Sequence, residues 1–104
     1  MKTPTRVEPF SASEILIAWT DGQSFAIPYI ELRFSCPCAN CVDEHTGKRI
    51  VQRESIGPEI RTTGVHTVGR YALQISFSDG HSTGIYPYET LLKICDKSGR
   101  LISV

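Results

Sequence analysis

The sequence has no excess charge of either sign, because eleven basic residues balance eleven acidic ones. Without net charge there is no general attraction to nucleic acid or to an anionic membrane. Its apolar runs stay far below the ~20 residues that a membrane span needs. Residues 1–6 also lack the apolar stretch of a secretion signal. We therefore expect a cytoplasmic protein with another protein as its partner, and with neither nucleic acid nor membrane in that role.

Cysteine is scarce outside one short segment. Of the four cysteines, three lie within residues 36–41, and Cys95 stands apart. Cysteines so close together in sequence cannot usefully clip distant parts of a chain, so we do not expect a disulfide framework. In a reducing cytoplasm, clustered cysteines more often bind metal or take part in catalysis. With 104 residues, 40% of them hydrophobic, the chain suits a single domain with a modest core.

Two segments have the pattern of a β-hairpin. In the first, β-favouring residues at 15–20 are followed by Asp21-Gly22 and a return strand at 24–27. In the second, apolar and polar residues alternate over 71–78, Asp79-Gly80 turns the chain, and residues 81–86 return. A two-residue turn there would place His81 opposite residue 78, on the polar face of the hairpin.

Each hairpin is followed by a similar Pro-Tyr segment, at 28–32 and 87–91, and then by a cysteine. We interpret this as a weak internal duplication of a hairpin and a short helix, although two ordinary hairpins with common turn residues would look similar. The strongest helix prediction covers residues 87–95, with proline in the first turn and Gly99 after the end. The predicted fold class is α+β: antiparallel hairpins, one helix in the C-terminal half and a zinc site, in one domain over residues 1–104.

The remaining segments carry weaker patterns. Residues 1–13 contain two prolines and several serines and threonines, so we expect a loose leader. Between the hairpins, residues 42–48 are expected to form a loop, and 49–52 and 63–68 are candidate strands. Gly57-Pro58 should break the chain between them.

Cys36, Cys38 and Cys41 follow a C-x-C-x2-C spacing. Thiolates suit zinc, copper(I) or iron–sulfur, and cysteines on one tight turn can point at a common centre. Packing alone explains three cysteines within six residues poorly, although three metal-free thiols are the alternative. Tetrahedral zinc takes four ligands, so one position remains to be filled, and His45, His66, His81 and Cys95 are the candidates. His45 would have to close an awkwardly short loop, whereas a hairpin turn fixes the backbone of His81.

Two stretches resemble a known family. Residues 32–41 (LRFSCPCANC), followed by Lys48-Arg49, are similar to the N-terminal domain of gamma-butyrobetaine and trimethyllysine hydroxylases, which also occurs as short bacterial proteins of the DUF971 family. Residues 71–86, including Asp79-Gly80-His81, resemble the same domain, and the resemblance covers about residues 13–96.

The resemblance implies a zinc site. In the hydroxylases this domain binds zinc through three cysteines and one histidine, which by position are Cys36, Cys38, Cys41 and His81. Cys95 falls where the family often has a cysteine that is not a ligand. The hydroxylases carry their iron and 2-oxoglutarate chemistry on a separate domain, and no histidine here is followed two residues later by a carboxylate. We therefore expect no oxygenase activity from this chain.

Three functions remain open at this point. The favoured one is a small zinc-binding accessory or interaction domain without catalytic activity. The alternative is a metal or iron–sulfur cluster assembly accessory protein, since some family members are fused to proteins of that process and thiolates also hold iron. A thiol redox enzyme is the third, but Cys38 and Cys41 are not followed by an evident helix, as redox pairs usually are.

Overall fold

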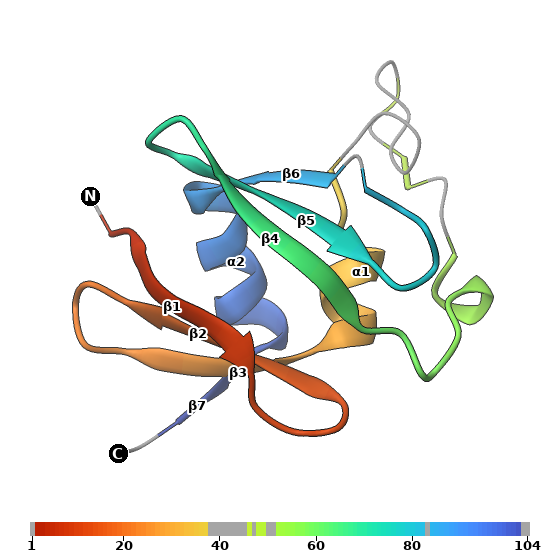
Figure 1. Ribbon diagram of the computed structural model, residues 1–104, viewed down its shortest axis with the longest axis horizontal. Coiled ribbons are helices and arrows are strands. Elements are labelled where there is room, and N and C mark those ends of the chain that lie inside the picture. The colour runs from red at the N-terminus through yellow and green to blue at the C-terminus, as the bar shows by residue number, and fades with distance from the viewer. Residues whose placement is uncertain (1, 38–45, 47, 50–51, 83, 103–104) are drawn as a thin grey trace.

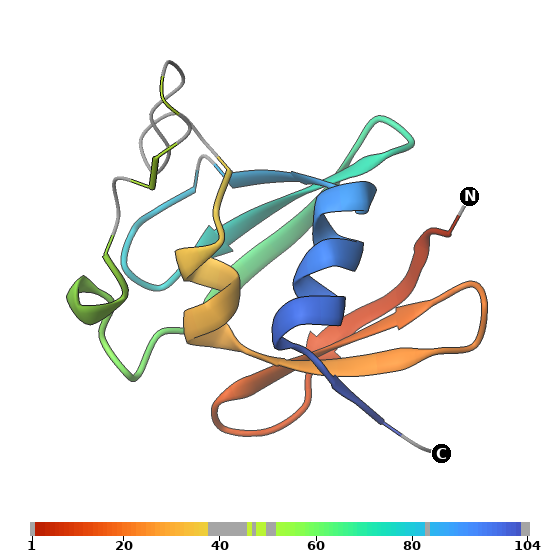
Figure 2. The same ribbon diagram turned by 180° about the vertical axis from the view of Figure 1, so that it is seen from behind.

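The computed structural model describes residues 2–37, 46, 48–49, 52–82 and 84–102. This part of the chain forms two antiparallel sheets with α-helices packed behind them. The strands face the viewer in Figure 1, and the two α-helices face the viewer in Figure 2. The predicted α+β class with antiparallel hairpins is confirmed.

The first sheet has the strand order β1-β2-β3-β7. Its members are β1 (Pro4–Pro9), β2 (Glu14–Trp19), β3 (Ser24–Pro28) and β7 (Arg100–Leu101). The strands β2 and β3 are the first predicted hairpin. The expectation of a loose leader is wrong, because β1 pairs with β2 and places Val7 opposite Ile17. The two prolines are tolerated because they stand at the ends of an edge strand, where a missing N–H need not break the ladder.

The second sheet has the order β4-β5-β6. It consists of β4 (Thr62–Val68), β5 (Ala72–Phe77) and β6 (Gly84–Pro87). The candidate strand at 63–68 and the second hairpin are both confirmed. Along β5, Leu73, Ile75 and Phe77 are buried while the residues between them are partly exposed. This is the half-buried strand that the alternation predicts.

Two α-helices are present in the described part, whereas the predicted fold class counted one. They are α1 (Tyr29–Phe34) and α2 (Tyr88–Ser98), and a 3-10 helix, η1, spans Arg53–Ser55. Each α-helix begins directly after a strand-ending proline whose φ, −57° or −58°, already suits a helix start. The helix predicted for 87–95 continues to Ser98 and ends before Gly99. Because α2 packs against both β3 and β6, it joins the two sheets.

The internal duplication is larger than a hairpin and a helix. The order β1-β2-β3-α1 recurs as β4-β5-β6-α2. Backbone hydrogen bonds at corresponding positions recur with it: Thr20 N to Thr3 O (3.0 Å) matches Ser78 N to Arg61 O (2.8 Å), and Tyr29 N to Ser13 O (3.0 Å) matches Tyr88 N to Tyr71 O (2.8 Å). Two unrelated hairpins would have no reason to share these bonds outside their turns.

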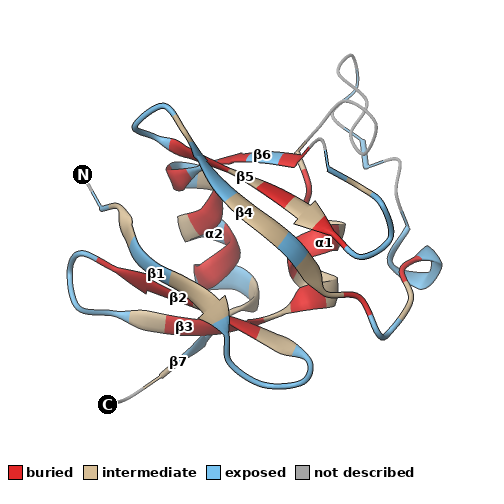
Figure 3. Ribbon diagram, in the orientation of Figure 1, coloured by how far each residue is buried: buried red, intermediate tan, exposed pale blue. Residues whose placement is uncertain are grey.

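The core lies between the sheets and the α-helices, where buried positions from both halves meet (Figure 3). Eight of its fully buried members form four matching pairs: Ile17 with Ile75, Ile27 with Tyr86, Leu32 with Leu91, and Cys36 with Cys95. The hydroxyl of Tyr86 donates a hydrogen bond of 2.7 Å to the carbonyl oxygen of Leu32, so the halves are also joined by a buried polar contact.

Candidate metal centre

Two of the four predicted metal ligands meet in the structure. The sulfur of Cys36 lies 3.1 Å from Nε2 of His81. Cys36 follows the C-terminal end of α1, in the first half of the duplication, and His81 follows the turn after β5, in the second half. The Cys36 side chain is fully buried, whereas His81 is partly exposed. The pair therefore lies at a junction between the halves, with one member inside the core and the other at its edge.

The turn before His81 differs from the predicted one. Phe77 N donates to His81 O at 2.8 Å and Gly80 N donates to Phe77 O at 3.1 Å, so residues 78–80 form a three-residue loop. Such loops need a residue with positive φ in the last position, and Gly80 has φ +87°. His81 is consequently opposite Phe77, not residue 78, and the two rings lie 6.5 Å apart. The predicted polar-face orientation is wrong, and the extra turn residue is what brings His81 to Cys36.

Asp79 holds this turn in place. Its Oδ1 accepts a hydrogen bond of 3.0 Å from the backbone N–H of His81. Its Oδ2 lies 2.9 Å from Nε of Arg33, whose side chain is only 11% exposed. The Arg33 guanidinium also lies 5.9 Å from the centre of the Phe77 ring. A cation this deeply buried requires a charged partner, and Asp79 supplies one.

The same contacts set the charge states near His81. Burial lowers the pKa of His81, and the positive charge of Arg33 lowers it further, although the Asp79 carboxylate opposes both. Burial would raise the pKa of Asp79, but hydrogen bonds from the His81 N–H and from Arg33 outweigh it, and the pKa is lowered. Neutral imidazole is the form that binds metal. The environment therefore favours the ligand form of His81.

Two further residues shape the surroundings of Cys36, and sequence reasoning gave neither of them this role. Arg49 Nη1 donates to the backbone carbonyl of Cys36 at 2.7 Å and to that of Phe34 at 2.6 Å. At Gly84, a Cβ atom would lie 3.0 Å from the Cys36 sulfur and 2.9 Å from the Tyr86 ring. A glycine in a strand, such as Gly84 at the start of β6, suggests a close approach, but nothing in the sequence identifies the sulfur as the neighbour.

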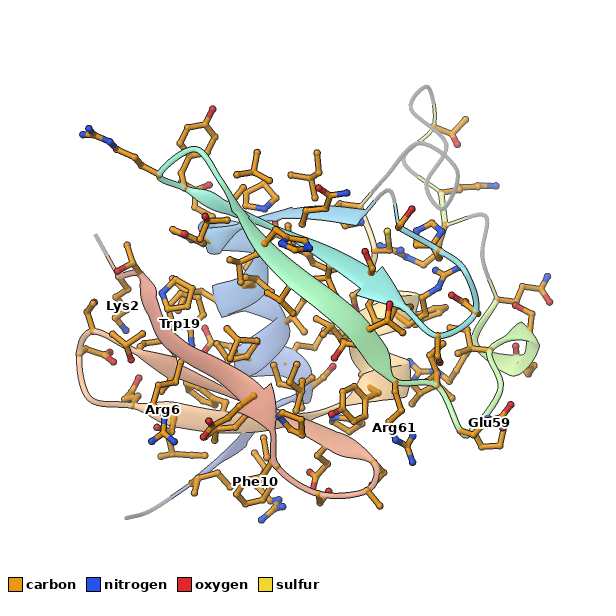
Figure 4. All side chains as sticks on the ribbon, in the orientation of Figure 1. Lys2, Arg6, Phe10, Trp19, Glu59 and Arg61 are labelled. Carbon is orange, nitrogen blue, oxygen red and sulfur yellow. The ribbon has the colours of Figure 1, made fainter. Side chains whose placement is uncertain are left out.

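Cys95 lies in a different environment. Burial raises the pKa of its thiol to about 11, an effect that the indole of Trp19 partly opposes. This contact is weak, because within the described part the Trp19 Nε1 atom has no hydrogen-bond partner of normal geometry. Trp19 lies on the side of Lys2, at the other end of the molecule from Glu59 (Figure 4). Glu59 lines the same surface depression as Asp79, so the surroundings of Cys95 are separate from the turn that precedes His81.

The remaining candidate ligands are not part of this cluster. His66 is exposed on β4. Among the residues that the structure describes, no three His, Cys, Asp or Glu side chains converge as a metal site requires, so Cys95 does not join Cys36 and His81. The predicted ligands Cys38 and Cys41, and the candidate His45, lie outside the described residues.

Comparison with known proteins identifies the family. The model of the family described as gamma-butyrobetaine hydroxylase-like, N-terminal, matches residues 10–92. The chain belongs to this family. A crystal structure of a DUF971 protein of unknown function from Acidithiobacillus ferrooxidans is 30% identical, with a TM-score of 0.64 over 88% of this chain and 90% of that one. The resemblance stated from the sequence is thereby confirmed.

Other relatives show the same fold or part of the same sequence. A protein structure determined by NMR in solution has a TM-score of 0.71 at 23% identity, over 90% of this chain and 69% of that one, and supports the fold alone. The gamma-butyrobetaine dioxygenase of Pseudomonas sp. (strain AK-1) is 28% identical over 76 residues, which are 73% of this chain and 20% of that enzyme. This chain thus spans about a fifth of that enzyme's length. Within the described residues, none of the helices is both long and apolar enough to cross a bilayer.

Proposed function

We propose that this protein is a zinc-binding accessory or interaction domain whose Cys36, Cys38, Cys41 and His81 form a structural site, and that it has no catalytic activity of its own. Four protein ligands would close the coordination sphere of the metal, as is typical of structural zinc. The metal would then join the two halves of the duplicated fold, and another protein in the cytoplasm would be the partner.

The observation that carries this proposal is the 3.1 Å distance between Cys36 Sγ and His81 Nε2. Zinc bonds of about 2.3 Å to sulfur and about 2.0 Å to nitrogen, at a tetrahedral angle, require a separation of about 3.5 Å. The observed distance fits a thiol–imidazole hydrogen bond, and a shift of about 0.4 Å would convert the pair into two corners of a zinc site. Such a shift is small enough for side-chain rotation alone.

The burial of Cys36 favours a structural role over nucleophilic catalysis. A thiol beside a histidine can be an activated nucleophile, but a nucleophile has to reach its substrate. The Cys36 side chain has 0% exposure. Gly84 packs directly beside its sulfur, and even a methyl group added at Gly84 would contact both this sulfur and the Tyr86 ring. A sulfur packed in this way can serve a ligand position inside the fold, and substrate cannot approach it.

Metal analysis of purified protein, expressed without added zinc, tests the proposal. We expect one zinc per chain in the wild type, less than half of that in Cys36→Ser, and an unchanged content in Cys95→Ser, which replaces the matching buried cysteine of the second half. Absorption of the fresh protein separates the alternative, because zinc is colourless and an iron–sulfur cluster is brown. Bound iron in place of zinc would favour the cluster-assembly function, and a wild type without metal would refute both.

A further inference from the structure

We propose that Arg33 and Asp79 are positioning residues that hold Cys36 and His81 at the separation metal binding needs. This inference rests on the proposed function and adds the second layer of the site. Arg33 lies in α1, three residues before Cys36, and Asp79 lies in the turn after β5, two residues before His81. They therefore link the two ligand-bearing segments directly.

The contacts form a closed ring. Cys36 N donates to the backbone carbonyl of Arg33 at 3.2 Å. The Arg33 side chain donates from Nε to Asp79 Oδ2 at 2.9 Å. Asp79 Oδ1 accepts from His81 N at 3.0 Å, and His81 Nε2 returns to the Cys36 sulfur at 3.1 Å. Each ligand residue is thus tied by its backbone to one member of a single ion pair.

The first half of the duplication provides an internal comparison. Asp21, which corresponds to Asp79, accepts a hydrogen bond of 3.0 Å from the N–H of Gln23, so the aspartate bond to the backbone is a property of both turns. The other partner differs. Asp21 pairs at 2.8 Å with Lys2, whose side chain is 47% exposed, whereas Asp79 pairs with the nearly buried Arg33. The basic partner is therefore nearly buried in the half whose turn carries a histidine and half-exposed where the turn carries glutamine, while both aspartates remain partly exposed, Asp79 at 36% and Asp21 at 28%.

Positioning and simple electrostatics predict different outcomes. If Arg33 and Asp79 acted only through their charges on an approaching cation, loss of Asp79 would weaken zinc binding and loss of Arg33 would strengthen it. If they hold the ligands in place, loss of either should weaken binding. Removal of residues that orient metal ligands typically costs 10–100-fold in affinity. The double variant should then lose about as much as each single one, because both break the same link.

The test compares the zinc affinity of full-length Asp79→Asn, Arg33→Gln and the double variant, measured by competition with a chromophoric chelator. Asp79→Asn keeps an oxygen for the His81 N–H and removes the charge that pairs with Arg33. Asp21→Asn makes the same change in the other turn and is the matched control. We expect a roughly tenfold loss or more for the first three, a change below twofold for the control, and altered Co²⁺ absorption bands in the first three only.

The outcomes separate the two proposals. A wild type that binds no zinc overturns the proposed function itself. If the wild type binds zinc and Asp79→Asn stays within twofold of Asp21→Asn, the positioning role is wrong while the metal site stands. A gain of affinity in Arg33→Gln likewise overturns positioning. Should Arg33→Gln fail to fold, the comparison of Asp79→Asn with Asp21→Asn decides by itself, since neither replacement changes a buried apolar contact.

Discussion

The proposed metal would act as a cross-link, and its contribution to stability can be worked out from the separation of its ligands. Cys36 and His81 are 45 positions apart in the chain. In the chain-entropy treatment of cross-links, closing a loop of that length stabilises the folded state by about 4 kcal/mol at 25 °C. This is a large share of the roughly 5–15 kcal/mol by which a domain is stable.

Replacement of His81 by alanine should therefore remove the cross-link even where the three cysteines still hold the metal. For a domain of this size, each kcal/mol changes the melting temperature by about 4–8 °C, so we expect a decrease of roughly 15–30 °C in the presence of zinc. Thermal unfolding followed by circular dichroism measures it. Addition of a strong chelator should bring the wild type down to the melting temperature of the variant.

The matched control is His66→Ala, because His66 is an exposed histidine of β4 and takes no part in the cluster. We expect its melting temperature to stay within about 5 °C of the wild type. The reasoning is refuted if His81→Ala and His66→Ala melt together in zinc. If chelation also leaves the wild type unchanged, the fold does not depend on a metal at all.

Three further predictions concern the neighbours of the site and its pH dependence. Gly84→Ala should destabilise the fold by about 1–3 kcal/mol in urea titration, because its Cβ would lie 3.0 Å from the buried Cys36 sulfur; Gly64→Ala, whose Cβ would meet only the His66 ring at 3.4 Å, is the control. Cys95→Ala should lower the free energy of unfolding by about 1 kcal/mol, because buried volume is removed, and should leave zinc affinity unchanged. Lost affinity would show that α2 contributes a ligand. Because the folded pKa of His81 lies below its ordinary 6.5, the metal-free protein should lose stability as pH falls through that value, and His81→Ala should show a flatter profile between pH 8 and 5.

The fold was largely readable from the sequence because its strongest signals are local. Alternation along β5 and the Asp-Gly turns predict both hairpins, and a proline before each helix marks its start. The first strand was missed because its prolines are typical of a loop. Proline is excluded from the interior of a sheet, but it is tolerated at the ends of the edge strand Pro4–Pro9. What decides this case is position in the sheet, which is a property of the tertiary structure.

The candidate site was readable in its residue types and less so in its geometry. The spacing of the cysteines predicts a metal site, the resemblance to the family selects His81 among four candidates, and the structure brings His81 to Cys36. The predicted reason was nevertheless wrong, because an Asp-Gly pair is compatible with both two-residue and three-residue turns, and the two turns send the next side chain to opposite faces of the hairpin. The link from Arg33 to Asp79 spans 46 positions, and no local pattern indicates a contact at that distance.

The duplication gives a physical reason why a cross-link would be useful at this place. Within the described residues, the two sheets share no backbone pairing, so their association depends on packing. At one end, α2 packs on both sheets and leads into β7, which pairs with β3 and returns the chain to the first sheet (Figure 1). At the other end, where α1 lies near the turn after β5, the halves meet through the ring from Cys36 to His81. A metal bound there would fasten the end at which the described residues place no strand between the halves. The turn of the first half, which is followed by Gln23, needs no such ligand because α2 and β7 already hold that side.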